Sequence, residues 1–191
     1  MQRMKRMMIR AAVAAAMLVV AHAPLDAQML TSPFRFGITG GATVPIGNIS
    51  NASNTGWNAG VLLDVGLPLV PIGFRLDATW QQLGDKHFSD GTDVKNRFIA
   101  GTANVLYTFN SMAPTKFYLI GGVGGYGLRS EVALPGGPSA TGSETKFGIN
   151  AGAGFRFQLT GFSTFIEARW HDVFTTGPSS QFIPISVGIT F

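Results

Sequence analysis

Charged residues recur at every second position in several segments of this chain of 191 residues. Glu167, Arg169 and His171 are the clearest case, because side chains two positions apart on a β-strand project from the same face. On a buried face, acids and bases must neutralise one another as ion pairs, or they can exchange partners along a narrow polar pathway. We predict an ion-pair network whose members are Arg35, Asp64, Arg75, Asp77, Arg156, Glu167 and Arg169.

A glycine-rich segment matches a nucleotide-binding pattern. Gly122, Gly124 and Gly127 satisfy G-x-G-x-x-G, but a dinucleotide site also needs a following helix to receive the pyrophosphate. The segment that follows is short and is interrupted by Pro135. We interpret these glycines as room for large neighbours on a curved sheet, and we expect no cofactor.

Three aspartates, Asp85, Asp90 and Asp93, offer oxygen ligands for Ca²⁺ or for an ion that bridges lipid phosphates. Their spacing does not match a known calcium loop. We interpret them as turn residues and expect no metal site.

Alternating apolar and polar residues indicate the strands that would position the charged side chains. Seven segments show this pattern, and an eighth, at 116–129, is a strand by composition. Each has roughly ten residues, and a tilted strand needs about 9–11 residues to cross a bilayer. The faces of the segment at 116–129 are ambiguous. We predict an all-β, eight-stranded antiparallel up-and-down barrel, with strands at 34–44, 57–67, 74–81, 99–109, 116–129, 147–157, 162–171 and 183–191.

The connections between these segments alternate in length. Those near 68–73, 110–115 and 160–161 are short, whereas the others are long and rich in small and polar residues. Long loops on one side and tight turns on the other are typical of a barrel in a bacterial outer membrane. The long connections are 47–56, 85–96, 133–145 and 175–181.

The polarity of the two faces also favours a membrane barrel. The charged residues share one set of faces and the aromatic residues share the other, which suits a polar lumen and a lipid-facing wall. A soluble, lipocalin-like barrel would place its apolar face inside. If the even-numbered strands run toward the periplasm, two belts of lipid-facing aromatic residues are expected, one at each membrane interface. The belt at the outer end would contain Trp57, Trp80 and Trp170, and the belt at the periplasmic end would contain Phe74, Phe109, Phe157 and Phe162.

The N-terminal segment is typical of an export signal. Arg3, Lys5, Arg6 and Arg10 precede an apolar run at 11–21 that is short for a membrane-spanning helix. We predict a Sec-type signal peptide at residues 1–27 and a barrel domain at residues 28–191. Cleavage would leave ten basic and nine acidic residues of the fourteen and ten in the whole chain, a net charge of +1. That balance excludes a nucleic-acid partner.

The C-terminal sequence ISVGITF resembles the recognition signal of bacterial outer-membrane proteins. FIEARWHDV (165–173) and FYLIGGVGGYG (117–127) are similar to strands of the OmpA/OmpX-like outer-membrane β-barrel family. The resemblance implies insertion by the barrel-assembly machinery with periplasmic chaperones. The residues that would carry the signal are Ile185, Val187, Ile189 and Phe191.

The segment His87-Phe88-Ser89 has the H-x-S spacing of outer-membrane lipid A deacylases. In that family a glutamate follows about a dozen residues later, but here that position is Ile99. We interpret His87 as a loop histidine and expect no enzyme activity.

Two prolines, Pro45 and Pro184, fall in the first and last strands, which are neighbours in a closed barrel. Because proline donates no ladder hydrogen bond, we predict a frayed seam between these strands near the outer rim.

Together these patterns predict an outer-membrane protein with a structural or surface-interaction role. Its contact surface would be the loops at 47–56, 85–96 and 133–145, and its surroundings would be outer-membrane lipid and lipopolysaccharide. The partner of these loops is not readable from the sequence. The alternatives are a narrow solute channel and, third, a lipid-modifying enzyme.

Overall fold

The computed structural model describes residues 33–67, 70–87, 89, 92–109, 114–133, 140–175, 177 and 179–191. Residues 1–31 form a separate unit from residues 32–191. The predicted signal peptide therefore lies outside the described residues, and so does Asp90.

Almost all of the described chain is β-structure. β4 has only two residues and continues the pairing of β3 with β5, so β3 and β4 form one wall element. Within the described ranges, no helix is long and apolar enough to cross a membrane. The elements are β1 (Phe34–Ile46), η1 (a 3-10 helix, Gly47–Asn51), β2 (Asn54–Gly66), β3 (Ile72–Gly84), β4 (Lys86–His87), β5 (Asp93–Phe109), β6 (Thr115–Ala133), β7 (Ala140–Gln158), β8 (Ser163–Val173) and β9 (Ser180–Thr190).

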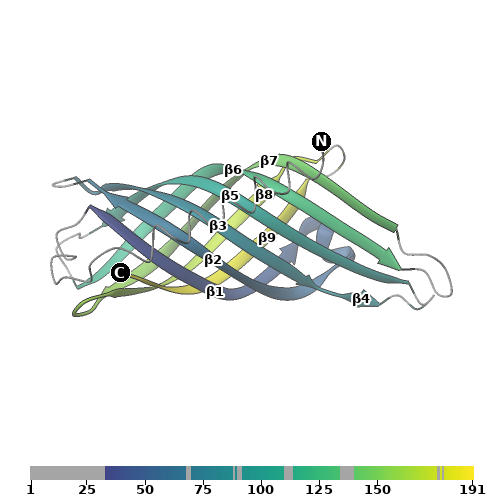
Figure 1. Cartoon of the computed structure of the whole chain (residues 1–191), viewed down its shortest axis with the longest axis horizontal. Coiled ribbons are helices and arrows are strands. Elements are labelled where there is room, and N and C mark those ends of the chain that lie inside the picture. The colour runs from purple at the N-terminus through teal and green to yellow at the C-terminus, as the bar shows by residue number, and fades with distance from the viewer. Residues whose placement is uncertain are drawn as a thin grey trace, which may run out of the picture. The chain divides into compact units, whose positions relative to one another are not determined.

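These elements close into a barrel of tilted strands (Figure 1). Each wall element pairs antiparallel with its neighbour in sequence, and β1 pairs with β9 to complete the circle. The predicted eight-stranded antiparallel up-and-down barrel is confirmed. Closure removes the sheet edges along the barrel wall, and edges of this kind are prone to pair with other chains. In the described structure, the extended part of β7 at 140–147 pairs with β6 on one side, and its pairing with β8 begins only at Gly148.

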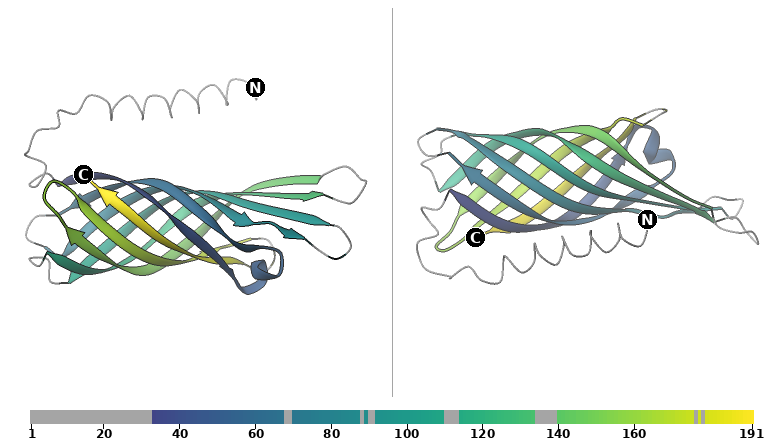
Figure 2. Two further views of the ribbon diagram at one scale, coloured as in Figure 1. Left: turned by 90° about the horizontal axis from the view of Figure 1, so that it is seen from below. Right: turned by 45° about the horizontal axis from the view of Figure 1, so that its top comes forward.

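The barrel has two different ends. At the turn end, short connections at 67–71, 110–114 and 159–162 join the strands. At the loop end lie η1 and the connections β3–β5, β6–β7 and β8–β9. Figure 2 shows that β5, β6 and β7 extend beyond the rest of the barrel at the loop end.

The length of these three strands corrects the sequence-based expectation of roughly ten residues. β5 has 17 residues, and β6 and β7 have 19 each. The β5–β6 register runs unbroken from Phe109↔Phe117 to Asp93↔Ala133. Much of 85–96 and 133–145, predicted as loops, is therefore strand. Where both faces of a hairpin meet water, the hydrophobic alternation is lost although the backbone pairing continues.

The seam between β1 and β9 is also different from the prediction. Pairing is continuous from Gly37↔Thr190 to Ile46↔Gln181, so the predicted fraying is wrong. The interruption lies on the other side of β9, where β8–β9 pairing stops after Ala168↔Ile185 and resumes at His171↔Phe182. A proline affects the ladder that its nitrogen faces, and Pro184 falls in the interrupted stretch.

Small residues on the inner wall make room for large ones. On β6, whose faces were ambiguous, Tyr118 and Tyr126 point inward and are fully buried. A Cβ atom added to Gly154 would lie 2.5 Å from Tyr118 Oη, and one added to Gly148 would lie 2.9 Å from Tyr126 Cε2. The glycines that make room for these large side chains are therefore on β7. On β6, Gly122 and Gly124 instead lie close to Asn104 and Thr102 of β5, and Gly127 has ordinary spacing.

We expect Gly154→Ala to destabilise the barrel by about 1–3 kcal/mol, the usual cost of overpacking. The measurement is urea unfolding of the refolded protein in lipid vesicles. Gly101→Ala is the matched control, because an added Cβ there has no neighbour within 4 Å. Equal stability of the two variants would contradict the packing argument.

Candidate functional site

The centre of the lumen is organised around Arg75 on β3, whose side chain is 0% exposed. Its Nε donates to Asp64 Oδ1 at 2.6 Å and its Nη2 to Asp64 Oδ2 at 3.2 Å, a two-point contact with β2. Its Nη1 donates to Glu167 Oε2 on β8 at 2.9 Å. The guanidinium also lies over the ring of Phe165, 5.0 Å from its centroid. Arg75 thus connects opposite walls of the barrel.

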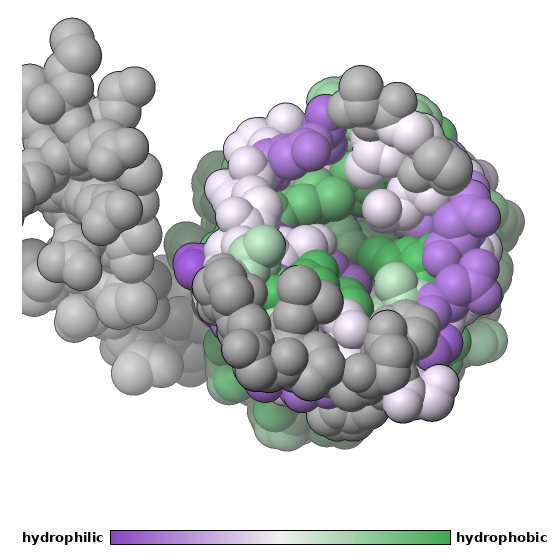
Figure 3. All heavy atoms as spheres, turned by 90° about the vertical axis from the view of Figure 1, so that its right-hand side faces the viewer, coloured by the Kyte–Doolittle hydropathy of each residue, from purple (hydrophilic) through white to green (hydrophobic). Residues whose placement is uncertain are grey.

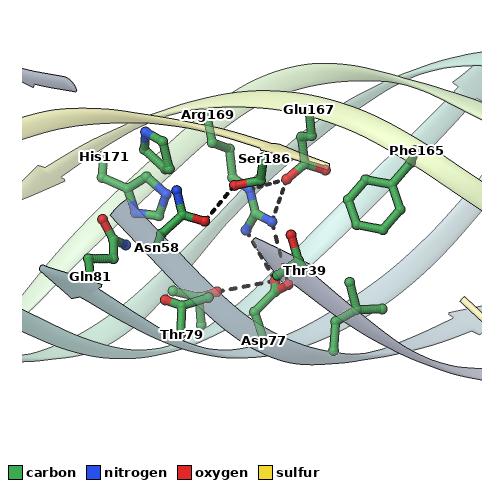
Figure 4. A pocket seen from close by; sticks show the side chains of 13 residues that line it. Thr39, Asn58, Asp77, Thr79, Gln81, Phe165, Glu167, Arg169, His171 and Ser186 are labelled. Carbon is green, nitrogen blue, oxygen red and sulfur yellow. Dashed lines mark hydrogen bonds and ion pairs between the residues drawn. The ribbon is translucent and has the colours of Figure 1, made fainter. Parts of the chain in front are cut away.

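The ion pairs continue from Arg75 in both directions. Arg169 donates from Nε to Glu167 Oε1 at 2.6 Å and from Nη1 to Asp77 Oδ2 at 3.1 Å (Figure 4). On the other side, Arg156 Nη2 donates to Asp64 Oδ2. The result is one alternating chain of cations and anions, here called the ion-pair chain, in the order Arg156, Asp64, Arg75, Glu167, Arg169 and Asp77.

The ion-pair chain contains every predicted network residue except Arg35. Arg35 lies on the same inner face, half-buried, and lines a cavity with Asp64 and Arg156 at the turn end. It is opposite Asp64 in the β1–β2 register. Its role in the lumen stays a prediction.

Neutral residues that the sequence analysis did not include complete the chain. Tyr118 Oη donates to Glu167 Oε2 at 2.7 Å, and Asn104 Nδ2 donates to Asp77 Oδ2 at 2.7 Å. Tyr118 was missed because its segment had no clear face. The one hint in the sequence was Gly154, which lies opposite Tyr118 in the β6–β7 register and leaves room for its ring.

Next to the ion-pair chain is a small central cavity of about 20 Å³, drawn in Figure 4. Ser186 Oγ donates to Asn58 Oδ1 at 2.8 Å beside it, and Gln81 Oε1 is buried there with no hydrogen-bond partner among the described residues. A space of this size holds about one water molecule.

Toward the loop end the lumen is apolar rather than charged. Six buried residues form a cluster, here called the apolar floor: Leu83, Phe98, Ala100, Tyr126, Val173 and Phe182. His171 stacks on Phe182 with ring centroids 5.0 Å apart, and its Nδ1 lies 2.8 Å from Tyr126 Oη. Figure 3 shows the hollow at this end, with hydrophobic residues inside and hydrophilic residues around its rim. The predicted filling by charged and polar side chains therefore describes only part of the lumen.

The remaining candidate motifs lie near the loop end. The backbone of His87 pairs opposite Asp93, and Asp85 forms a partly exposed ion pair with Lys95 at 3.2 Å. Among the described residues, no group of three or more His, Cys, Asp or Glu side chains could hold a metal ion.

The outer wall is apolar along the barrel. Large hydrophobic side chains point outward from every long strand, and the predicted belt residues are among them. Trp57 and Trp80 lie toward the loop end and Phe74 toward the turn end, whereas Trp170 is half-buried. The other exposed belt residues are Phe109, Phe157 and Phe162. A closed barrel with paired charges inside and an apolar exterior is a membrane-spanning β-barrel.

Comparison with known proteins agrees with this class. The family model described as "Outer membrane protein beta-barrel domain" matches residues 11–191, and the chain belongs to this family. It is a protein of the bacterial outer membrane. Comparison with curated protein sequences gives no match.

Solved structures of outer-membrane proteins share the fold. Neisserial surface protein A (NspA) is similar with a TM-score of 0.62 and 22% identity, over 83% of this chain and 96% of that chain. A major outer membrane protein from Thermus thermophilus has a TM-score of 0.59 and 14% identity, over 83% and 98%. Ail of Yersinia pestis has a TM-score of 0.52 and 13% identity, over 84% and 100%.

We expect Glu167→Gln to destabilise the barrel by about 3–5 kcal/mol, because it leaves Arg75 and Arg169 buried with one carboxylate fewer. Urea unfolding in vesicles, followed by tryptophan fluorescence, measures the effect. Glu144→Gln is the control, since Glu144 is exposed and its partly exposed pair with Lys146 is worth at most about 1 kcal/mol. An unfolding midpoint for Glu167→Gln equal to that of the control would contradict the role of the ion-pair chain.

Proposed function

We propose that this protein is a non-enzymatic structural and surface-interaction barrel, and that its loop end is the contact surface. The observation that carries this proposal is the closed lumen. Arg75 crosses the lumen and is paired with Asp64 on one side and Glu167 on the other. Its hydrogen-bond donors are therefore occupied and do not bind a solute that moves through the barrel.

Three cavities in the described part of the barrel support this interpretation. The loop-end cavity has about 270 Å³, the central one about 20 Å³ and the turn-end one about 170 Å³. The apolar floor lies between the first two, and the ion-pair chain continues from the second to the third. A narrow channel is the alternative, and it would require ion pairs to separate.

The extended hairpins supply the surface. β6 and β7 pair as far as Val132↔Ala140, and the first six residues of β7, at 140–145, are exposed and mostly polar. Because short turns of such barrels face the periplasm, we place the loop end outside the cell, close to lipopolysaccharide. We propose that η1 and the tips of β5–β7 meet an extracellular partner.

We expect the refolded protein to be silent in a planar bilayer at the single-channel level. Insertion is checked first, by the resistance of the folded barrel to unheated denaturing electrophoresis. Reproducible conductance steps that change in Arg169→Gln, with the outward-facing Phe147→Ala as control, would instead establish the channel alternative.

The orientation is testable because the chain has no cysteine. We expect Ser143→Cys, at the loop end, to react with a membrane-impermeant maleimide on intact cells. Thr160→Cys, at the turn end, is expected to react only after the outer membrane is opened. The reverse labelling pattern would contradict the proposed orientation.

Biogenesis is part of the proposal. The residues that resemble the assembly signal are Ile185, Val187 and Ile189 on β9 and the following Phe191, and their side chains are exposed. We propose that the barrel-assembly machinery and periplasmic chaperones recognise them after export directed by residues 1–27.

A further inference from the structure

Three cationic side chains gather at the turn end of the lumen. Arg35 on β1, Lys116 on β6 and Arg156 on β7 line one cavity of about 170 Å³. Lys116 and Arg156 are directly opposite each other in the β6–β7 register, an arrangement in which like charges destabilise a sheet. Lys116 interacts electrostatically with both arginines.

The inward charges of the lumen do not balance at this end. Among the described side chains from the turn end as far as Asp77, five cationic groups face three carboxylates. Asp64, Glu167 and Asp77 are engaged by Arg75, Arg156 and Arg169 in the ion-pair chain. In the part of the barrel that the structure describes, Arg35 and Lys116 form no ion pair within 4 Å. Arg35 is attracted to Asp64, but that carboxylate is already paired with Arg75 and Arg156. The turns at 67–71, 110–114 and 159–162 contain no acidic residue that could neutralise Arg35 and Lys116.

A buried, unsatisfied hydrogen-bond donor of Arg156 indicates the kind of ligand that the turn-end cavity would bind. The side chain of Arg156 is only 7% exposed, and its Nε has no hydrogen-bond partner among the described residues. Leaving a buried charged donor unsatisfied is costly, so a partner with oxygen acceptors and negative charge would stabilise this cavity.

We propose that the turn-end cavity is a binding site for a phosphate-type oxyanion. A doubly charged phosphate or phosphomonoester neutralises the excess of two positive charges, and its oxygens accept hydrogen bonds from guanidinium and ammonium groups. The cavity is also lined by apolar residues at the β2–β3 connection, among them Leu67 and Val70 of the turn and Ile72 at the start of β3. Both soluble phosphate and a phosphomonoester lipid headgroup have the required chemistry. The site is independent of the surface role proposed above.

The test is thermal unfolding of the refolded protein in a maltoside detergent, with inorganic phosphate titrated against chloride at constant ionic strength. We expect the unfolding midpoint of the wild type to rise with phosphate, as for any ligand that binds only the folded state. Lys116→Gln and Arg35→Gln are expected to weaken the apparent affinity about tenfold or more, the loss for one charge-assisted hydrogen bond. Lys116→Arg should retain the response, and Lys95→Gln, at the loop end, should leave it unchanged.

A second arm replaces phosphate with phosphatidic acid in the mixed micelle. Stabilisation by inorganic phosphate that is lost in Lys116→Gln identifies a soluble oxyanion site. Stabilisation only by phosphatidic acid, lost in the same variant, identifies a lipid headgroup site. In ligand-free buffer Lys116→Gln should be at least as stable as the wild type, because a repulsion is removed. No response to either ligand, or an equal response in Lys116→Gln, would overturn the proposal.

Discussion

Charge neutralisation inside a narrow barrel is the constraint on which the rest of this structure depends. An ionised side chain in the lumen loses most of its water, and the cost is several kcal/mol unless a partner replaces that water. Arg75 meets this condition through Asp64 on one side and Glu167 on the other. The strands that carry these residues are thereby held across the lumen as well as along their edges.

The packing around the ion-pair chain follows from the same constraint. A long guanidinium group needs space and a flat surface, and Phe165 and Tyr118 supply the surface from two walls. Gly188 and Gly154 supply the space behind those rings, because an added Cβ atom would collide with them. Toward the loop end, where the charges stop, aromatic packing such as Phe98 against Phe182 fills the same role.

The alternation of polar and apolar residues was sufficient to predict the barrel and the inward charges, because lipid on one side and a polar lumen on the other impose a period of two. It could not predict Tyr118 or Tyr126, since the glycines around them carry no polarity to mark a face. It also failed beyond the membrane, where β5–β7 continue in water. The effect of Pro184 was predicted on the β1 side of β9, but it lies on the β8 side. The pattern of polar and apolar residues does not show which neighbouring strand a backbone N–H faces.

The extended β6–β7 hairpin has a consequence for how the surface of this protein can vary. Its pairing is in register for its whole length, so each arm can gain or lose two residues without changing which side chains face inward. A change of one residue in a single arm would turn the side chains beyond it to the opposite face. Viable length variants of the hairpin should therefore differ in steps of two residues per arm, with free substitution at the tip. The barrel wall can in this way stay the same while the length and sequence of the β6–β7 hairpin vary.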